Sequence, residues 1–101
     1  MREVYQIFFD SKAGLIPGAL RLSQNGGVSS GELEMFGNPL TLSDVQFDGN
    51  RRRFQGSLNL DDQLLNFRAE GELEDDVLDI MVQGAGRKML WTGFLQKETE
   101  A

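Results

Sequence analysis

The chain has 101 residues, a length that predicts one domain over 1–101. It contains no Cys and no His, which excludes disulfides, thiolate nucleophiles, Ser–His–Asp triads and the usual zinc sites. Ten Lys and Arg against sixteen Asp and Glu give a net charge of −6, which argues against nucleic acid and anionic membrane surfaces as partners.

Apolar residues alternate with polar ones along most of the chain, as in Leu20-Arg21-Leu22 and Leu78-Asp79-Ile80. This period of two is typical of strands that bury one face. Short breaks such as Asn25-Gly26-Gly27 and Asp48-Gly49-Asn50 favour tight hairpins. The pattern predicts eight strands, at residues 3–10, 18–25, 28–36, 39–48, 51–60, 63–73, 77–83 and 87–96.

One break is longer than the others. Residues 11–18 include Pro17 and two glycines, and we expect a loop there with at most a helical turn near 12–16. A second irregularity falls at Asp44, because Leu42 and Val45 have opposite parity and cannot face the same side of a regular strand. This change of phase predicts a β-bulge.

Strands joined by turns of two to four residues are antiparallel neighbours, so the eight form a meander. Closing the meander into a barrel removes its free edges. The fold class expected is therefore all-β, an eight-stranded antiparallel up-and-down barrel. A flattened roll or a two-sheet sandwich is the alternative.

Five residues are candidates for binding a ligand inside such a barrel. Arg52 shares the inward parity of Phe54, so its guanidinium either points at a bound anion near the barrel mouth or reaches water at the strand end. Phe67 has inward parity on its own strand. Tyr5 and Trp91 lie on the first and last strands, which become neighbours on closure, and serve either as packing anchors or as ligand-stacking groups.

The size of any interior pocket is open at this stage. An eight-stranded barrel is either filled by its own side chains or holds one small ligand. Gly31, Gly56 and Gly71 lie on or near inward positions, where small residues would open space. A small apolar ligand is therefore one expected partner.

A second kind of partner is predicted by apolar residues on both faces of the terminal strands. Phe8 alternates with Ile7 and Phe9, while Leu90 and Phe94 have the parity opposite to Trp91. The outward set is expected to contact a second copy of the chain or a fused or partner domain.

Catalysis, metal binding and cofactors are not expected. The acidic run over 68–79 alternates along one strand face, which favours a solvated surface over a calcium site. Tyr5 with a carboxylate is the one remaining route to acid–base chemistry. The start of the chain, Met1 to Gln6, lacks the features of a secretory signal, so a cytoplasmic location is expected.

Strand and turn motifs over nearly the whole chain resemble a known family. They include Gly18-Ala19-Leu20-Arg21-Leu22, Asn25-Gly26-Gly27, Phe47-Asp48-Gly49-Asn50 and Trp91-Thr92-Gly93. The chain resembles small lipocalin-like (calycin-type) β-barrel domains of uncharacterised bacterial proteins. Val4-Tyr5-Gln6 stands where lipocalins carry a Gly-x-Trp signature, and no functional residue is carried over.

The function expected is that of a non-catalytic β-barrel module that binds a small apolar ligand or a partner domain. The alternative is a structural accessory or oligomerisation domain of a larger enzyme or complex.

Overall fold

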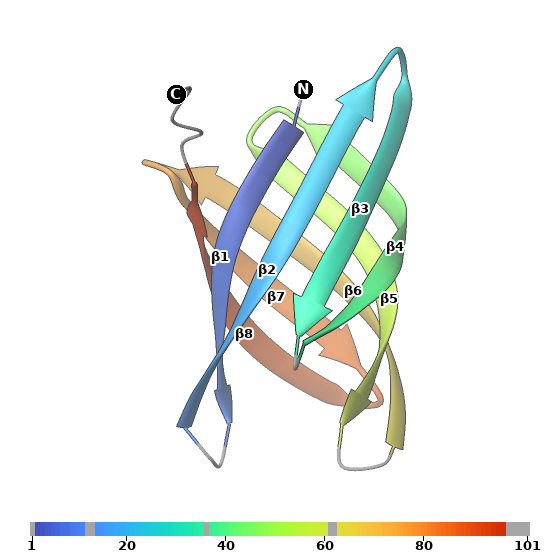
Figure 1. Ribbon diagram of the computed structural model, residues 1–101, viewed down its shortest axis with the longest axis vertical. Coiled ribbons are helices and arrows are strands. Elements are labelled where there is room, and N and C mark those ends of the chain that lie inside the picture. Colours follow the sequence, from blue (N-terminus) through green and yellow to red (C-terminus); the bar gives the residue numbers. More distant parts are fainter. Residues whose placement is uncertain (1, 12–13, 36, 61–62, 97–101) are drawn as a thin grey trace.

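The computed structural model describes residues 2–11, 14–35, 37–60 and 63–96. Its eight strands follow one another around a closed barrel, each antiparallel to its neighbours, with β1 paired to β8 (Figure 1). This confirms the all-β up-and-down barrel in place of the flattened roll or two-sheet sandwich, because β1 and β8 are paired. The strands are β1 (Arg2–Ser11), β2 (Gly14–Asn25), β3 (Val28–Met35), β4 (Asn38–Asp48), β5 (Arg51–Leu60), β6 (Gln63–Glu74), β7 (Val77–Gly84) and β8 (Arg87–Leu95).

The second strand begins earlier than the sequence predicts. Gly14 to Pro17 extend β2 and pair with β1, so the loop expected there is wrong for these residues, and 12–13 lie outside the described part of the chain. Among the described residues, pairing of β2 with β3 ends at Gly18 opposite Met35, and the preceding residues of β2 pair with β1 alone. Pro17 is tolerated because no described residue of β3 is paired with it.

The predicted bulge is confirmed in β4. The register between β4 and β5 shifts between Ser43 and Gln46, and Asp44 adopts a φ of 50°. The extra residue restores the phase, so that both Leu42 and Val45 are buried inside the barrel.

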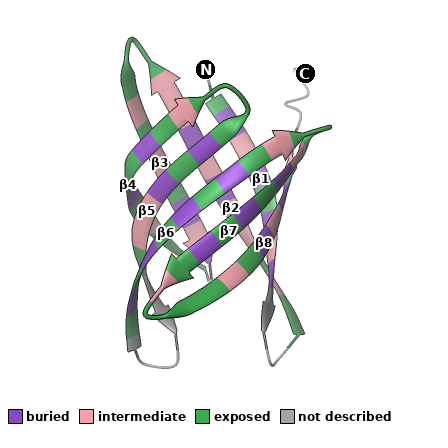
Figure 2. Cartoon of the chain, turned by 180° about the vertical axis from the view of Figure 1, so that it is seen from behind, coloured by how far each residue is buried: buried purple, intermediate pink, exposed green. Residues whose placement is uncertain are grey.

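The barrel interior is a continuous apolar core. Figure 2 shows buried residues alternating with exposed or intermediate ones over much of the sheet, as a closed sheet with one inner face requires. The buried apolar residues are Tyr5, Ile7, Phe9, Leu20, Leu22, Leu33, Met35, Leu42, Val45, Phe54, Leu65, Phe67, Ala69, Leu78, Ile80, Val82 and Trp91. Within the described residues there is no helix with the length and apolarity needed to cross a membrane.

Candidate functional site

All five residues predicted to bind a ligand lie inside the barrel. They separate into two groups at different heights, because Tyr5 pairs with Leu95 whereas Phe9, four residues further along β1, pairs with Trp91. Four residues of a strand span about 13 Å. Tyr5 and Arg52 belong to one group, and Phe54, Phe67 and Trp91 to the other, so closure does not bring Tyr5 and Trp91 into one site.

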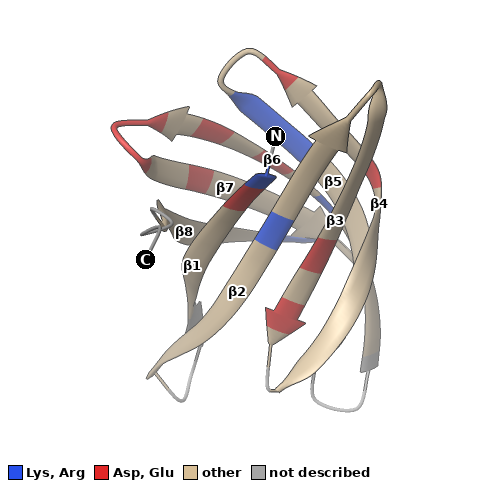
Figure 3. Ribbon diagram, turned by 45° about the horizontal axis from the view of Figure 1, so that its top comes forward, with Lys and Arg blue, Asp and Glu red and all other residues tan. Residues whose placement is uncertain are grey.

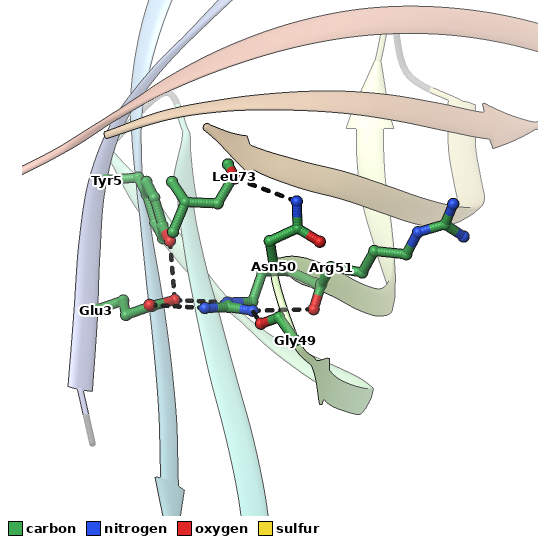
Figure 4. A network of polar contacts seen from close by, with 7 residues as sticks. Glu3, Tyr5, Gly49, Asn50, Arg51 and Leu73 are labelled. Carbon is green, nitrogen blue, oxygen red and sulfur yellow. Dashed lines mark hydrogen bonds and ion pairs between the residues drawn. The ribbon is translucent and has the colours of Figure 1, made fainter. Parts of the chain in front are cut away.

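A buried ion pair organises the first group. Arg52 of β5 donates from Nε to Glu3 Oε1 at 2.8 Å and from Nη2 to Glu3 Oε2 at 3.0 Å. The hydroxyl of Tyr5 donates to the same Oε1 at 2.8 Å. Because β1 and β5 are four strands apart, this network crosses the interior from wall to wall (Figure 4).

The remaining contacts of Arg52 hold its guanidinium in place. Nη1 donates to the carbonyl oxygens of Gly49 at 2.7 Å and Arg51 at 3.0 Å, and the ring of Phe47 lies 4.8 Å from the guanidinium carbon. Only 5% of Arg52 is exposed. The interpretation that this side chain reaches water is therefore wrong, and the anion that it faces is a carboxylate of the same chain.

Each member of the network shifts the pKa of the others. Burial alone would raise the pKa of Glu3, but the hydrogen bonds from Arg52 and Tyr5 and the positive charge of Arg52 outweigh burial and lower it. Burial and the Glu3 carboxylate raise the pKa of Tyr5. The hydrogen bond to Glu3 raises the pKa of Arg52 against the effect of burial.

These shifts make the network a poor acid–base pair at neutral pH. General acid–base catalysis works best with groups whose pKa lies near the operating pH. Here the carboxyl pKa is lowered and the phenol pKa is raised, so both move away from neutrality. The arrangement suits a fixed ion pair that closes the interior near the β4–β5 turn.

Aromatic rings form the second group. The ring of Trp91 lies 5.7 Å from that of Phe67 and 6.0 Å from that of Phe9, and Phe67 contacts Phe54 edge-on at 6.4 Å. Such tilted and edge-to-face contacts add to the burial of the rings. The indole Nε1 of Trp91 is buried and has no hydrogen-bond partner in the described part of the chain.

The three interior glycines do not open a pocket. A Cβ at Gly31 would lie 3.0 Å from Leu22 and 3.1 Å from Leu42. A Cβ at Gly56 would lie 2.8 Å from Phe67, and one at Gly71 would lie 2.9 Å from Leu78. Neighbouring side chains already fill the volume next to each glycine, so the expectation that these residues create space is wrong.

The middle parts of the terminal strands present an outer face without charge, which we call the uncharged face. Exposed Arg2 and Lys88 lie at its two ends, and Asp79 of β7 borders it opposite Thr92. Phe94 packs edge-on against Phe8 with ring centroids 6.1 Å apart, while 43% of Phe94 and 61% of Leu90 remain exposed. Exposed Met81 of β7 is the cross-strand partner of Leu90 and extends the face. The uncharged face consists of Val4, Gln6 and Phe8 of β1 and Leu90, Thr92 and Phe94 of β8.

Charged side chains cluster elsewhere on the barrel, mainly on β3 and β5–β7 (Figure 3). Arg51 and Arg53 of β5 lie 3.0 and 3.6 Å from Glu70 of β6. Arg21 of β2 lies 3.1 Å from Glu32 of β3. In the part of the chain that the structure describes, no group of acidic side chains is arranged to hold a metal ion.

Glu3 is the residue of the buried network that the sequence analysis did not single out. Its parity places it on the inner face with Tyr5, and Arg52 has inward parity on β5. A carboxylate and a guanidinium that are both predicted to face inward near strand ends are the signal that would have identified the pair.

No protein family matches the chain, and comparisons with curated proteins and with solved structures found no significant match. The fold and the arrangement of residues described above are therefore the basis for any functional conclusion.

Proposed function

We propose that the protein is a non-catalytic binding module whose filled barrel is a rigid scaffold and whose uncharged face binds a second copy of the chain. The observation that carries this proposal is the exposed apolar surface around Phe94 and Leu90, which lies on a chain of net charge −6. Aromatic residues and Met are enriched at the centres of protein interfaces, where charged residues are depleted.

Three properties of the barrel favour a copy of the chain as the occupant. In the closed order every strand has a hydrogen-bonded neighbour on both sides, which leaves side-chain faces as the main surfaces for association. Two molecules that each carry net negative charge repel one another least where neither face bears charge. A face that is apolar and uncharged is complementary to itself, as the two-fold interface of a homodimer requires.

Light scattering on chromatographed protein tests the proposal. The expected mass is twice the 11.3 kDa of one chain. The substitution Phe94→Lys is expected to give a monomer, because a dimer would bury one added positive charge from each copy in the interface. Leu64→Lys is the matched control: Leu64 is 67% exposed on β6, outside the uncharged face, and its replacement is expected to leave the mass unchanged. A wild-type monomer at several hundred micromolar would contradict the proposal.

A small apolar ligand inside the barrel is the second candidate, favoured by one observation. A buried indole N–H without an acceptor is costly, and a carbonyl or hydroxyl of a ligand close to Trp91 would satisfy it. Native mass spectrometry of freshly purified protein tests this candidate: an adduct that is lost in Trp91→Phe supports it, and the bare chain mass after exposure to a lipid extract contradicts it.

The resemblance to lipocalin-like domains belongs to this proposal as well. Its support is the coarse architecture alone, eight antiparallel strands in up-and-down order around one closed barrel. We propose kinship at that level and assign no lipocalin ligand to the chain.

A further inference from the structure

A concave surface of about 550 Å³ lies on the outside of the barrel beside the β7–β8 turn. It is formed by β5, β6 and the hairpin of β7 and β8. Its polar side chains are Gln55, Asn66, Arg68, Gln83, Arg87 and Lys88. The volume falls within the range of about 300–1,000 Å³ that is typical of small-molecule sites.

This surface, which we call the basic pocket, holds three cations and no carboxylate. That is unusual in a chain with sixteen acidic and ten basic residues. Arg68, Arg87 and Lys88 form no ion pair with any described residue, whereas Arg21, Arg51 and Arg53 each lie within 4 Å of a Glu. A larger concave surface over β4–β8, about 800 Å³, adjoins the basic pocket and shares Gln55, Arg68 and Gln83 with it. Its other lining residues include the carboxylates Glu70, Glu72, Glu74 and Asp79.

Strand register brings four of the six polar side chains of the basic pocket into one row. Gln55 is opposite Arg68, Arg68 is opposite Gln83, and Gln83 is opposite Lys88. Neighbouring strands lie about 4.8 Å apart, so the two cations of the row are separated by about 10 Å at their Cα atoms. Their long side chains can therefore converge on one anion above Gln83.

The hairpin that carries the third cation is held rigidly. Ala85 and Gly86 have φ values of 49° and 75°, the signature of a tight type I′ turn. A Cβ on Gly84, the last residue of β7, would collide with the carbonyl oxygen of Asn66, so this end of the hairpin packs directly on the backbone of β6. Arg87 follows this turn opposite Gly84 and has the parity opposite to Lys88, so it lies at the rim of the basic pocket and not in the row with Arg68.

We propose that the basic pocket binds the phosphate ester of a small polyhydroxylated molecule, such as a sugar phosphate. Arg68 and Lys88 bind the phosphate, the Arg68 guanidinium through two parallel hydrogen bonds and the Lys88 ammonium as a point charge. The amides of Gln55, Asn66 and Gln83 supply donors and acceptors that match hydroxyl groups. This site is separate from the uncharged face and does not depend on self-association.

NMR titration of ¹⁵N-labelled protein with glucose 6-phosphate and with inorganic phosphate tests the proposal. Saturable shifts are expected at Arg68 and at the amides of the β7–β8 turn, with glucose 6-phosphate binding more tightly than inorganic phosphate. The double variant Arg68→Gln, Lys88→Gln is expected to weaken binding about tenfold or more, because even one charge-assisted hydrogen bond accounts for that factor.

The double variant Arg51→Gln, Arg53→Gln is the matched control. It removes the same charge from the outer surface, but at residues that are paired with Glu70, and the affinity is expected to stay within about twofold. Linear shifts spread over the whole surface, or equal losses in both double variants, would overturn the proposal. Equal affinity for inorganic phosphate and glucose 6-phosphate would overturn the role of the amides.

A lipid headgroup can present the same chemistry, and vesicles distinguish this source from a free ester. The protein would be sedimented with vesicles of phosphatidylcholine and phosphatidylinositol. Co-sedimentation that is lost in the Arg68→Gln, Lys88→Gln variant would support phosphate binding at the basic pocket and would assign the phosphate to a lipid. Binding to the vesicles that persists in that double variant, together with no shifts from glucose 6-phosphate, would overturn it.

Discussion

Replacing Glu3 by Leu is expected to destabilise the barrel more than replacing a carboxylate on the surface would. The substitution removes both carboxylate bonds of Arg52, at 2.8 and 3.0 Å, and leaves a guanidinium that is 5% exposed. Removing one partner of a buried ion pair costs about 3–5 kcal/mol. Arg52 keeps its bonds to two backbone carbonyls, so we expect the lower end, about 3 kcal/mol.

Substitution of the partner, Arg52, and the double variant complete a thermodynamic cycle. Arg52→Met leaves the Glu3 carboxylate with Tyr5 as its one remaining partner in the described network, and the expected cost is again about 3 kcal/mol. With Leu at position 3 and Met at position 52, no charge is buried, and the cost is expected to fall to about 1 kcal/mol. The coupling free energy between the two sites is then about 5 kcal/mol.

Urea unfolding followed by the fluorescence of Trp91, the one tryptophan of the chain, measures these values. Each single variant is also expected to lower the melting temperature by about 12–24 °C, given about 4–8 °C per kcal/mol for a domain of this size. Single-variant costs below about 1 kcal/mol, or costs that simply add in the double variant, would refute the assignment of a buried, mutually dependent pair.

Three further predictions follow from the same interior. The pKa of Glu3 is lower in the folded chain than in the unfolded chain. Below about pH 4.5 the unfolded chain therefore binds more protons, and the free energy of unfolding falls as the pH decreases. Glu3→Gln should flatten this pH dependence in urea titrations. The pKa of Tyr5 is raised, so stability should also fall above about pH 10, and Tyr5→Phe should remove that loss at a cost of about 1 kcal/mol at neutral pH. Gly56→Ala should destabilise by about 1–3 kcal/mol because its Cβ would meet Phe67 at 2.8 Å, and an unchanged unfolding midpoint would show that the interior has spare room.

The strands and their antiparallel order could be predicted from the sequence because two local signals agree, whereas closure was inferred from the removal of free sheet edges. Alternation fixes which side chains face inward, and the Gly, Asn and Asp turns fix antiparallel order. The start of β2 was missed because Pro17 and its flanking glycines break strands in most contexts. Their tolerance here depends on β3 ending at Met35, which is not a property of the local segment.

Of the buried network, the inward position of Arg52 could be predicted from the sequence, but its pairing with Glu3 could not. Parity placed Arg52 inside, but its partner Glu3 is 49 residues away in the chain and four strands away around the barrel. Whether two inward charges meet depends on the stagger of the whole barrel, which alternation does not encode. The same holds for Gly31 and Gly56, since neighbouring strands decide whether a missing side chain leaves space.

The proposal that the uncharged face binds a second copy of the chain makes a prediction about individual contacts. Isotope-filtered NMR on a mixture of labelled and unlabelled chains is suited to this test, because it detects only contacts between molecules. We expect intermolecular contacts that join Phe8, Leu90 and Phe94 of one chain to the same residues of its partner. The absence of such contacts at millimolar protein, or contacts that map to the charged strands β5 and β6, would contradict the claim.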